Sequence, residues 1–128
     1  MRKTYNVDSG VQNGTEIRFL LQELPEELEV NAGGQLITDS DEMAFVYLMD
    51  SAEGYTYVLF PKTVWPLLAI SLTSEQEPIL AWGAKDIRLT NFREELEMLI
   101  FNIEGNHNYG EDFSSAVEDL FKEHLAAQ

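Results

Sequence analysis

The first half of the chain alternates apolar and polar positions in the way that is typical of β-strands. Residues 16–22 carry apolar side chains at nearly every second position, which predicts a strand with one buried face. Residues 4–8 form another expected strand, and Asn13-Gly14 between the two is a strong signal for a tight turn. We therefore expect residues 4–8 and 16–22 to pair as a β-hairpin.

More strands are expected in the next part of the chain. Residues 24–34 read as a connection with one helical turn, followed by a short strand at 35–38. The segment 43–49 is apolar on both faces, which predicts a central strand. A four-residue loop ending in Gly54 separates it from a strand at 55–60, so these two strands should also form a hairpin.

Helical spacing of apolar residues begins after this hairpin. Thr63 can cap a helix that continues to residue 72, because Pro66 is tolerated in a first helical turn. Two short strands are then expected, at residues 78–82 and 86–89, before the chain returns to helical spacing.

The C-terminal third is predicted to hold two helices. Asn91 and Glu94 have the spacing of a capping box, and Gly105 suits the position just after a helix end. Between them one apolar stripe is formed by Phe92, Leu96, Leu99, Ile100 and Ile103. A last helix is expected at residues 112–126, with His124 as a half-buried packing residue on its apolar stripe.

Together these elements predict one α+β domain that spans residues 1–128. We expect an antiparallel sheet of five or six strands with about three helices packed on one face, the last two forming a C-terminal helical hairpin. The length is about that of one domain, and a hydrophobic content of 45% suits a packed core.

A net charge of −15, from 23 acidic and 8 basic residues, limits the partners that the chain can bind. Affinity for nucleic acid depends on lysines and arginines that neutralise phosphates, and an anionic membrane would repel the chain for the same reason. We expect neither partner. The acids are spread over both halves, which favours a role in solubility over mimicry of a nucleic acid.

The absence of cysteine excludes disulfides, thiolate nucleophiles and zinc–thiolate sites. The N-terminus lacks the apolar region of a signal peptide, and no apolar run is long enough to cross a membrane. We therefore expect a cytoplasmic protein, and no motif in the chain indicates a cofactor.

The densest polar stretch, residues 102–112, is the first candidate site. Asn106, His107, Asn108 and Tyr109 are candidates for ligand or partner contacts, together with Asp39 and Asp41 in a turn before a strand. As a calcium loop the stretch fails, because the sixth position needs glycine and the twelfth needs a bidentate carboxylate. Nothing assigns a catalytic residue or a metal ligand, and glycine, asparagine and acids also suit a turn between helices.

Five aromatic residues form the second candidate: Tyr47, Tyr55, Tyr57, Trp65 and Trp82. Such residues could form a surface that stacks on a ligand or partner. Aromatics that alternate on neighbouring strands are also ordinary cross-strand core pairs, so both interpretations stay open.

Four strings in this order resemble the YjbL-like family of small acidic uncharacterised proteins of Firmicutes. They are DSDEMAFVYLMD at 39–50, YTYVLFPKTVW at 55–65, LTNFREEL at 89–96 and NIEGNHNYG at 102–110. The resemblance covers residues 34–123 and implies a bacterial cytosolic protein. It implies no activity, cofactor or site residue.

The leading hypothesis is a non-enzymatic module that binds a protein partner through an acidic or aromatic surface. The helical region 93–123 supports this hypothesis, because it holds nine acidic residues and only two basic residues, Arg93 and Lys122. The alternative is a domain that binds a small molecule or divalent metal, possibly an enzyme, centred on the loop 102–112. The pattern leaves the oligomeric state open.

Overall fold

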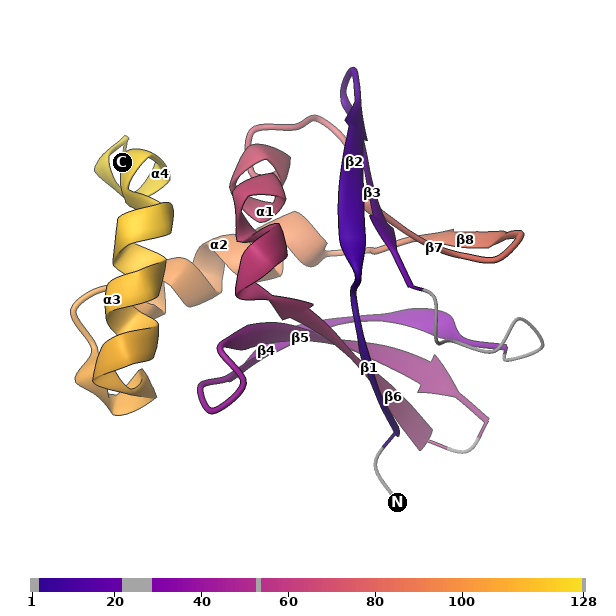
Figure 1. The fold of residues 1–128 in the computed structure, drawn as a ribbon, viewed down its shortest axis with the longest axis horizontal. Helices are drawn as coiled ribbons and strands as arrows, with labels where there is room; N and C mark the ends of the chain where they lie inside the picture. The colour runs from indigo at the N-terminus through magenta and orange to yellow at the C-terminus, as the bar shows by residue number, and fades with distance from the viewer. Residues whose placement is uncertain (1–2, 22–28, 53, 128) are drawn as a thin grey trace.

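The computed structural model describes residues 3–21, 29–52 and 54–127, and shows an α+β fold with two sheets of four strands (Figure 1). The first sheet has the order β1 (Lys3–Asn6), β6 (Gly54–Pro61), β5 (Ala44–Ser51), β4 (Asn31–Asp39). The second has the order β2 (Ser9–Asn13), β3 (Glu16–Leu20), β7 (Ile79–Trp82), β8 (Lys85–Arg88). The prediction of a single sheet of five or six strands was therefore wrong.

The chain passes from one sheet to the other within two residues. The Val7 amide donates to the Leu59 carbonyl in the first sheet, and the Asp8 amide donates to the Leu20 carbonyl in the second, both at 2.9 Å. As a result β1 pairs in parallel with β6, and β3 pairs in parallel with β7. The expected all-antiparallel pairing fails because local alternation does not encode which distant strand becomes the neighbour.

The first hairpin exists, but with a different first strand. β3 pairs with β2 and not with residues 4–8, which lie largely in β1 of the other sheet. Asn13 pairs with Glu16, so the turn is Gly14-Thr15, and Gly14 has a φ of 62° that favours glycine. Ser9, Gly10 and Gln12 have low strand propensity, which hid β2 from the sequence analysis.

β5 is a central strand, as predicted. Its side chains Phe45, Tyr47 and Met49 point into the main core, whereas Val46 and Leu48 belong to a smaller cluster on the outer face. β4 is longer than expected and contains a bulge between Ala32 and Gln35. Within 24–34, where one helical turn was expected, residues 24–28 lie outside the described residues and residues 31–34 belong to β4.

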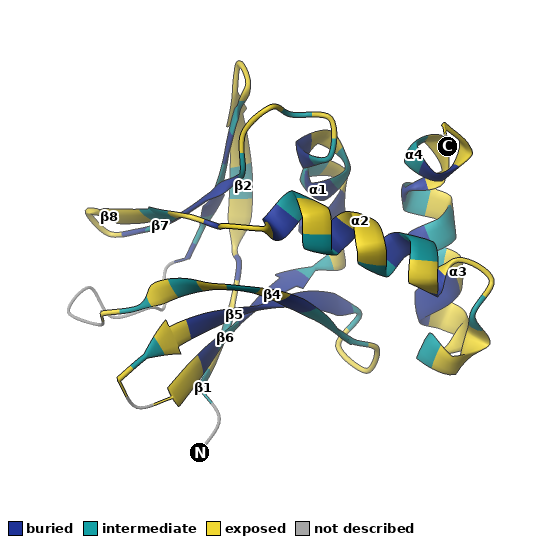
Figure 2. Ribbon diagram, turned by 180° about the vertical axis from the view of Figure 1, so that it is seen from behind, coloured by how far each residue is buried: buried dark blue, intermediate teal, exposed yellow. Residues whose placement is uncertain are grey.

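The described residues form four α-helices and two 3₁₀ turns, whereas about three helices were expected. The helices are α1 (Trp65–Ser71), α2 (Phe92–Ile103), α3 (Glu111–Leu120) and α4 (Lys122–Ala126); the 3₁₀ turns are η1 (Lys62–Val64) and η2 (His107–Tyr109). The expected last helix is divided at Phe121, whose φ of −100° and ψ of 15° leave the helical region. Figures 1 and 2 show α2 and α3 crossing each other, so they do not form the expected antiparallel hairpin.

Helix ends also differ from the expected caps. Neither Thr63 nor Asn91 makes a side-chain cap: Val64 precedes α1, and Asn91 has a left-handed φ of 62° with no side-chain cap bond. Gly105 follows α2 with a φ of 70°, as predicted for the residue after a helix end.

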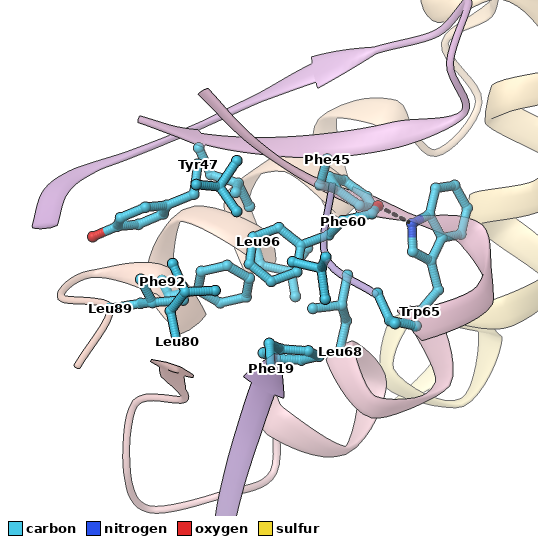
Figure 3. Packing of buried hydrophobic residues seen from close by; sticks show 14 of the residues in the cluster. Phe19, Phe45, Tyr47, Phe60, Trp65, Leu68, Leu80, Leu89, Phe92 and Leu96 are labelled. Atoms are coloured by element: carbon cyan, nitrogen blue, oxygen red, sulfur yellow. Dashed lines mark hydrogen bonds between the residues drawn. The ribbon is translucent and has the colours of Figure 1, made fainter. Parts of the chain in front are cut away.

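The core lies between the two sheets and the helices (Figure 2). Aromatic rings meet at its centre, where the ring centroids of Phe19 and Phe60 are 5.0 Å apart and those of Phe60 and Phe92 are 5.1 Å apart. The Trp65 indole N–H donates to the Phe60 carbonyl at 2.9 Å (Figure 3). This bond satisfies a fully buried donor and fixes the start of α1 against β6.

The edge strand β4 is covered by α2. The Leu36 amide donates to the Glu95 carboxylate at 3.1 Å. The Tyr47 hydroxyl accepts from the Gly34 amide at 3.0 Å and donates to the Thr90 carbonyl at 2.6 Å. Burial raises the pKa of Tyr47 above its ordinary value. These bonds satisfy backbone groups of a strand edge that could otherwise pair with another chain.

Candidate functional site

Several backbone groups and one side chain of the loop 102–112 are hydrogen-bonded within the same chain. The Asn106 side-chain oxygen accepts from the Asn108 amide at 3.1 Å, and its carbonyl accepts from the Ser114 hydroxyl at 2.8 Å. The Gly105 amide donates to the Glu118 carboxylate at 2.7 Å. This arrangement ends α2, forms η2 and begins α3, so turn formation explains much of the stretch.

The side chains of His107 and Tyr109 differ in how far they are buried. His107 is exposed, while Tyr109 is half-buried and packs against the main core. The two side chains that a helix–helix turn does not require therefore do not face one shared cleft. Tyr109 has a packing role, and His107 is available to solvent.

The turn that carries Asp39 and Asp41 lies next to this loop. A side chain at Gly110 would place its Cβ 3.7 Å from the Ser40 Cβ. The Asp39 carboxylate accepts from the Glu42 amide at 3.1 Å, a local bond that stabilises the turn, and Asp41 is exposed. In the described part of the chain, no group of three or more His, Asp or Glu residues is placed to hold a metal ion.

The five aromatic candidates divide into two sets. Tyr47, Trp65 and Trp82 are buried in the main core. Tyr55 and Tyr57 lie on the outer face of β6 with ring centroids 6.5 Å apart, and Tyr55 is 52% exposed. Core packing therefore holds for three of the five aromatic candidates, and the alternative of an aromatic surface is reduced to a tyrosine pair.

A groove that the sequence analysis did not identify crosses the C-terminal end of α1. One cavity of about 350 Å³ lies between α1 and α4, and a second of about 340 Å³ lies between α1 and the β2–β3 hairpin. Both are lined by Ile70 and Thr73, so they adjoin. Figure 1 shows α1 between the hairpin and α4. We call this feature the Ile70 groove; its other apolar lining includes Ile17, Ala69, Leu120 and Phe121.

Ile70 is exposed because α1 is short and buries its opposite side. Trp65, Leu68 and Ser71 face the core, and Ile70 is left 38% exposed. The helix ends there, where the Thr73 hydroxyl donates to the Ile70 carbonyl at 2.9 Å. The sequence signal for this exposure is that Ile70 lies outside the helical face that positions 64, 65, 68 and 72 share.

Sequence comparison places the chain in a family. The family model described as "Family of unknown function (UPF0738)" matches residues 5–121. The chain belongs to UPF0738.

Relatives in this family cover almost the whole chain. A UPF0738 protein of Lysinibacillus sphaericus is 43% identical over 126 residues, which is 98% of this chain and 99% of the relative. The UPF0738 protein YjbL of Bacillus subtilis is 32% identical over 121 residues, 94% of this chain and 99% of the relative. No solved structure matches. The expected resemblance to the YjbL-like family is confirmed.

The UPF0738 match includes the whole loop 102–112 and most of the Ile70 groove, while Glu123 and His124 lie beyond it. Searching the described residues finds no helix that is both long and apolar enough to span a membrane.

The charged side chains that line the Ile70 groove are acidic. Glu75 and Glu123 are exposed on its lining, and no lysine or arginine is among the described residues that line it. His124 is half-buried as predicted. Its ring nitrogen lies 2.9 Å from the Glu97 carboxylate and its ring packs near Phe101.

Arg93 lies beside the groove residue Ser74, and its guanidinium is paired with a carboxylate. Its guanidinium pairs with Glu77 at 3.2 Å and donates to the Ser74 carbonyl. The groove lining thus carries two exposed carboxylates beside apolar side chains, and the exposed Lys122 lies between the lining residues Phe121 and Glu123 in the chain.

Proposed function

We propose that this UPF0738 protein is a non-enzymatic interaction module that binds a basic amphipathic segment of a partner protein in the Ile70 groove. One observation carries the proposal. Two adjoining cavities meet at a partly exposed isoleucine, and their charged lining side chains, apart from His124, are carboxylates.

An amphipathic helix is the occupant that this geometry favours. Such helices lay their apolar face into a hydrophobic groove and leave their charged face outside. Ile70 and the half-buried Leu120 would contact the apolar face, and Glu75 and Glu123 would attract lysines or arginines at the rim. A second copy of the chain is disfavoured, because two molecules of net charge −15 repel each other.

Model peptides test this proposal directly. A labelled Leu/Lys amphipathic peptide of about 15 residues makes roughly four helical turns, enough to cross both cavities. Fluorescence anisotropy should show saturable binding that weakens as salt screens the carboxylates. A Leu/Glu peptide of the same pattern should not bind, because its charges are repelled at the rim.

A matched pair of variants separates the groove from the general surface. Ile70→Lys should weaken binding of the Leu/Lys peptide at least about tenfold, because it removes the apolar anchor and adds repulsion. Met98→Lys makes the same change at a 52% exposed site on α2 outside the groove, and should have little effect. Equal losses in both variants would reject the groove as the binding site.

A second function, binding of a small molecule or divalent metal, is favoured by one observation. The loop 102–112 and the Asp39–Asp41 turn are adjacent at Gly110 and Ser40. A ligand at 100 times its dissociation constant would raise the free energy of unfolding by about 2.7 kcal/mol, which a thermal-shift screen of divalent metals detects. Asp41→Asn and His107→Ala should remove any such shift; a shift that survives both variants would locate the ligand elsewhere.

A further inference from the structure

The tip of the β2–β3 hairpin carries a reactive pair of residues that neither proposed function uses. Asn13 is the last residue of β2, and Gly14 follows it as the first residue of the two-residue turn. The turn itself is Gly14-Thr15, so Asn13 stays in the strand and does not use the left-handed conformation that asparagine tolerates. Figure 1 shows this tip projecting from the rest of the molecule.

Both groups of the pair are accessible. Asn13 and Gly14 are exposed, and the Asn13 side chain makes no hydrogen bond to another described residue. The closing pair of the hairpin is Asn13–Glu16, and the Gly14 amide donates to no residue that the structure describes. A Cβ added at Gly14 would meet nothing within 4 Å, so the amide nitrogen is open to attack a neighbouring group.

The other six asparagines of the chain lack this combination. Each of them is followed by a residue whose side chain shields the next amide nitrogen. Asn31 is a close match, because it is also an exposed residue at the end of a strand, but Ala32 follows it. Asn106 precedes His107, and its side-chain oxygen accepts from the Asn108 amide at 3.1 Å, which holds the side chain in the turn.

We propose that Asn13 is a site of spontaneous deamidation, in which the Gly14 amide nitrogen attacks the side-chain carbon Cγ of Asn13. The N–Cγ bond forms, the Cγ–Nδ2 bond breaks, and the proton of the Gly14 amide leaves with the side-chain nitrogen as ammonia. Water then opens the resulting succinimide at one of its two carbonyl carbons. Opening at the main-chain carbon gives isoaspartate, in which the chain continues through the side chain, and opening at Cγ gives aspartate.

The position at the end of the hairpin permits ring closure. The Asn13 backbone must leave its extended conformation for Cγ to reach the Gly14 nitrogen. Asn13–Glu16 is the last pair of the ladder, and the ends of such elements open at a low free-energy cost. The reaction therefore proceeds from the open tip, without unfolding of the rest of the sheet.

The modification changes one side of the Ile70 groove. Isoaspartate adds a methylene group to the main chain directly before a two-residue turn, and the length of that turn sets the register of the hairpin. Gly14 and Thr15 line the cavity between the hairpin and α1, and the Ser74 hydroxyl donates to the Thr15 carbonyl at 2.9 Å. We expect this bond to be lost in the isoaspartate form.

Ageing of the purified protein tests the proposal with an internal control. After incubation at mildly alkaline pH, mass spectrometry of a digest measures the conversion of amide to acid at Asn13 and at Asn31 in the same sample. Conversion at Asn13 should be faster by at least about tenfold. Its rate should rise with pH, because the Gly14 amide must lose its proton. An isoaspartyl methyltransferase, used as a reagent, should label the aged chain and not the fresh chain.

A matched pair of variants locates the reaction. Asn13→Ser should remove the methyl label from the aged protein, whereas Asn31→Ser should leave it unchanged. In the aged parent protein, the backbone amide signals that move should be those of the hairpin tip and of Ser74, and those of α2 should stay in place. Equal conversion at Asn13 and Asn31 would overturn the proposal, and so would a label that persists in Asn13→Ser.

Discussion

The loop 102–112 and the Ile70 groove differ in how many of their groups are already bonded or covered within the fold. The loop has many polar groups, yet Asn106 accepts two hydrogen bonds from its own chain and Tyr109 packs on the core. Polar residues line the groove as well, yet Ile70 is exposed and Ala69 and Leu120 are only half-buried between α1 and α4. Binding capacity depends on groups that remain unsatisfied or uncovered, and residue types alone do not report this.

The largest effect is expected at the floor of the groove. Phe121 is buried, and its ring centroid lies 6.1 Å from that of Phe45 and 6.3 Å from that of Trp65. Phe121→Ala should lower the free energy of unfolding by about 3–5 kcal/mol, because it removes apolar contacts and leaves a cavity. Urea denaturation measures this. A loss below about 1 kcal/mol would show that the groove floor is not continuous with the core.

A smaller effect is expected at Tyr47, a polar group used inside the fold. Tyr47→Phe leaves the Gly34 amide and the Thr90 carbonyl without this partner, so we expect a loss of about 1–3 kcal/mol near neutral pH.

The same residue predicts a pH dependence. Burial raises the pKa of Tyr47 above its ordinary value of 10.0, so the folded state holds the proton more tightly than the unfolded state. Its contribution is fully present below pH 10 and is lost as the pH rises through the folded-state pKa. The stability gap between the parent protein and Tyr47→Phe should therefore narrow above pH 10. A constant gap in denaturation curves across this range would contradict the assigned burial.

The loop should respond modestly when one of its internal bonds is removed. The buried Ser114 hydroxyl donates to the Asn106 carbonyl, and Ser114→Ala should cost about 1 kcal/mol. Amide exchange at residues 105–110 should accelerate in this variant, since the bond connects η2 to α3. Unchanged exchange would mean that the turn is held by its backbone alone.

The smallest effect is expected at His107. Its side chain is exposed, so His107→Ala should change the free energy of unfolding by less than about 0.5 kcal/mol. Peptide binding in the Ile70 groove should also be unchanged. A large effect of His107→Ala on either measurement would instead favour the loop 102–112 as the functional site.

Local patterns predicted the elements whose neighbours lie close in sequence. The apolar segment 43–49 is central in its sheet, the β5–β6 hairpin forms, and α2 buries the predicted stripe with Gly105 after its end.

Non-local features could not be predicted in this way. The exchange of sheets at Val7 and Asp8 depends on carbonyls of Leu59 and Leu20, which no local alternation identifies. Ile70 is exposed because α4 and the β2–β3 hairpin lie on either side of it without covering it. Likewise, Trp82 looks like any core aromatic in the sequence, and only three-dimensional packing shows that its N–H lacks an acceptor.

The central claim is that the Ile70 groove, and not the polar loop, is the binding surface. The most direct test measures the affinity of the Leu/Lys peptide for the parent protein, Ile70→Lys, Met98→Lys and His107→Ala under one salt condition. We expect the affinity for the peptide to fall by about tenfold or more in Ile70→Lys alone. Undiminished binding in Ile70→Lys, or a comparable loss in Met98→Lys or His107→Ala, would contradict it.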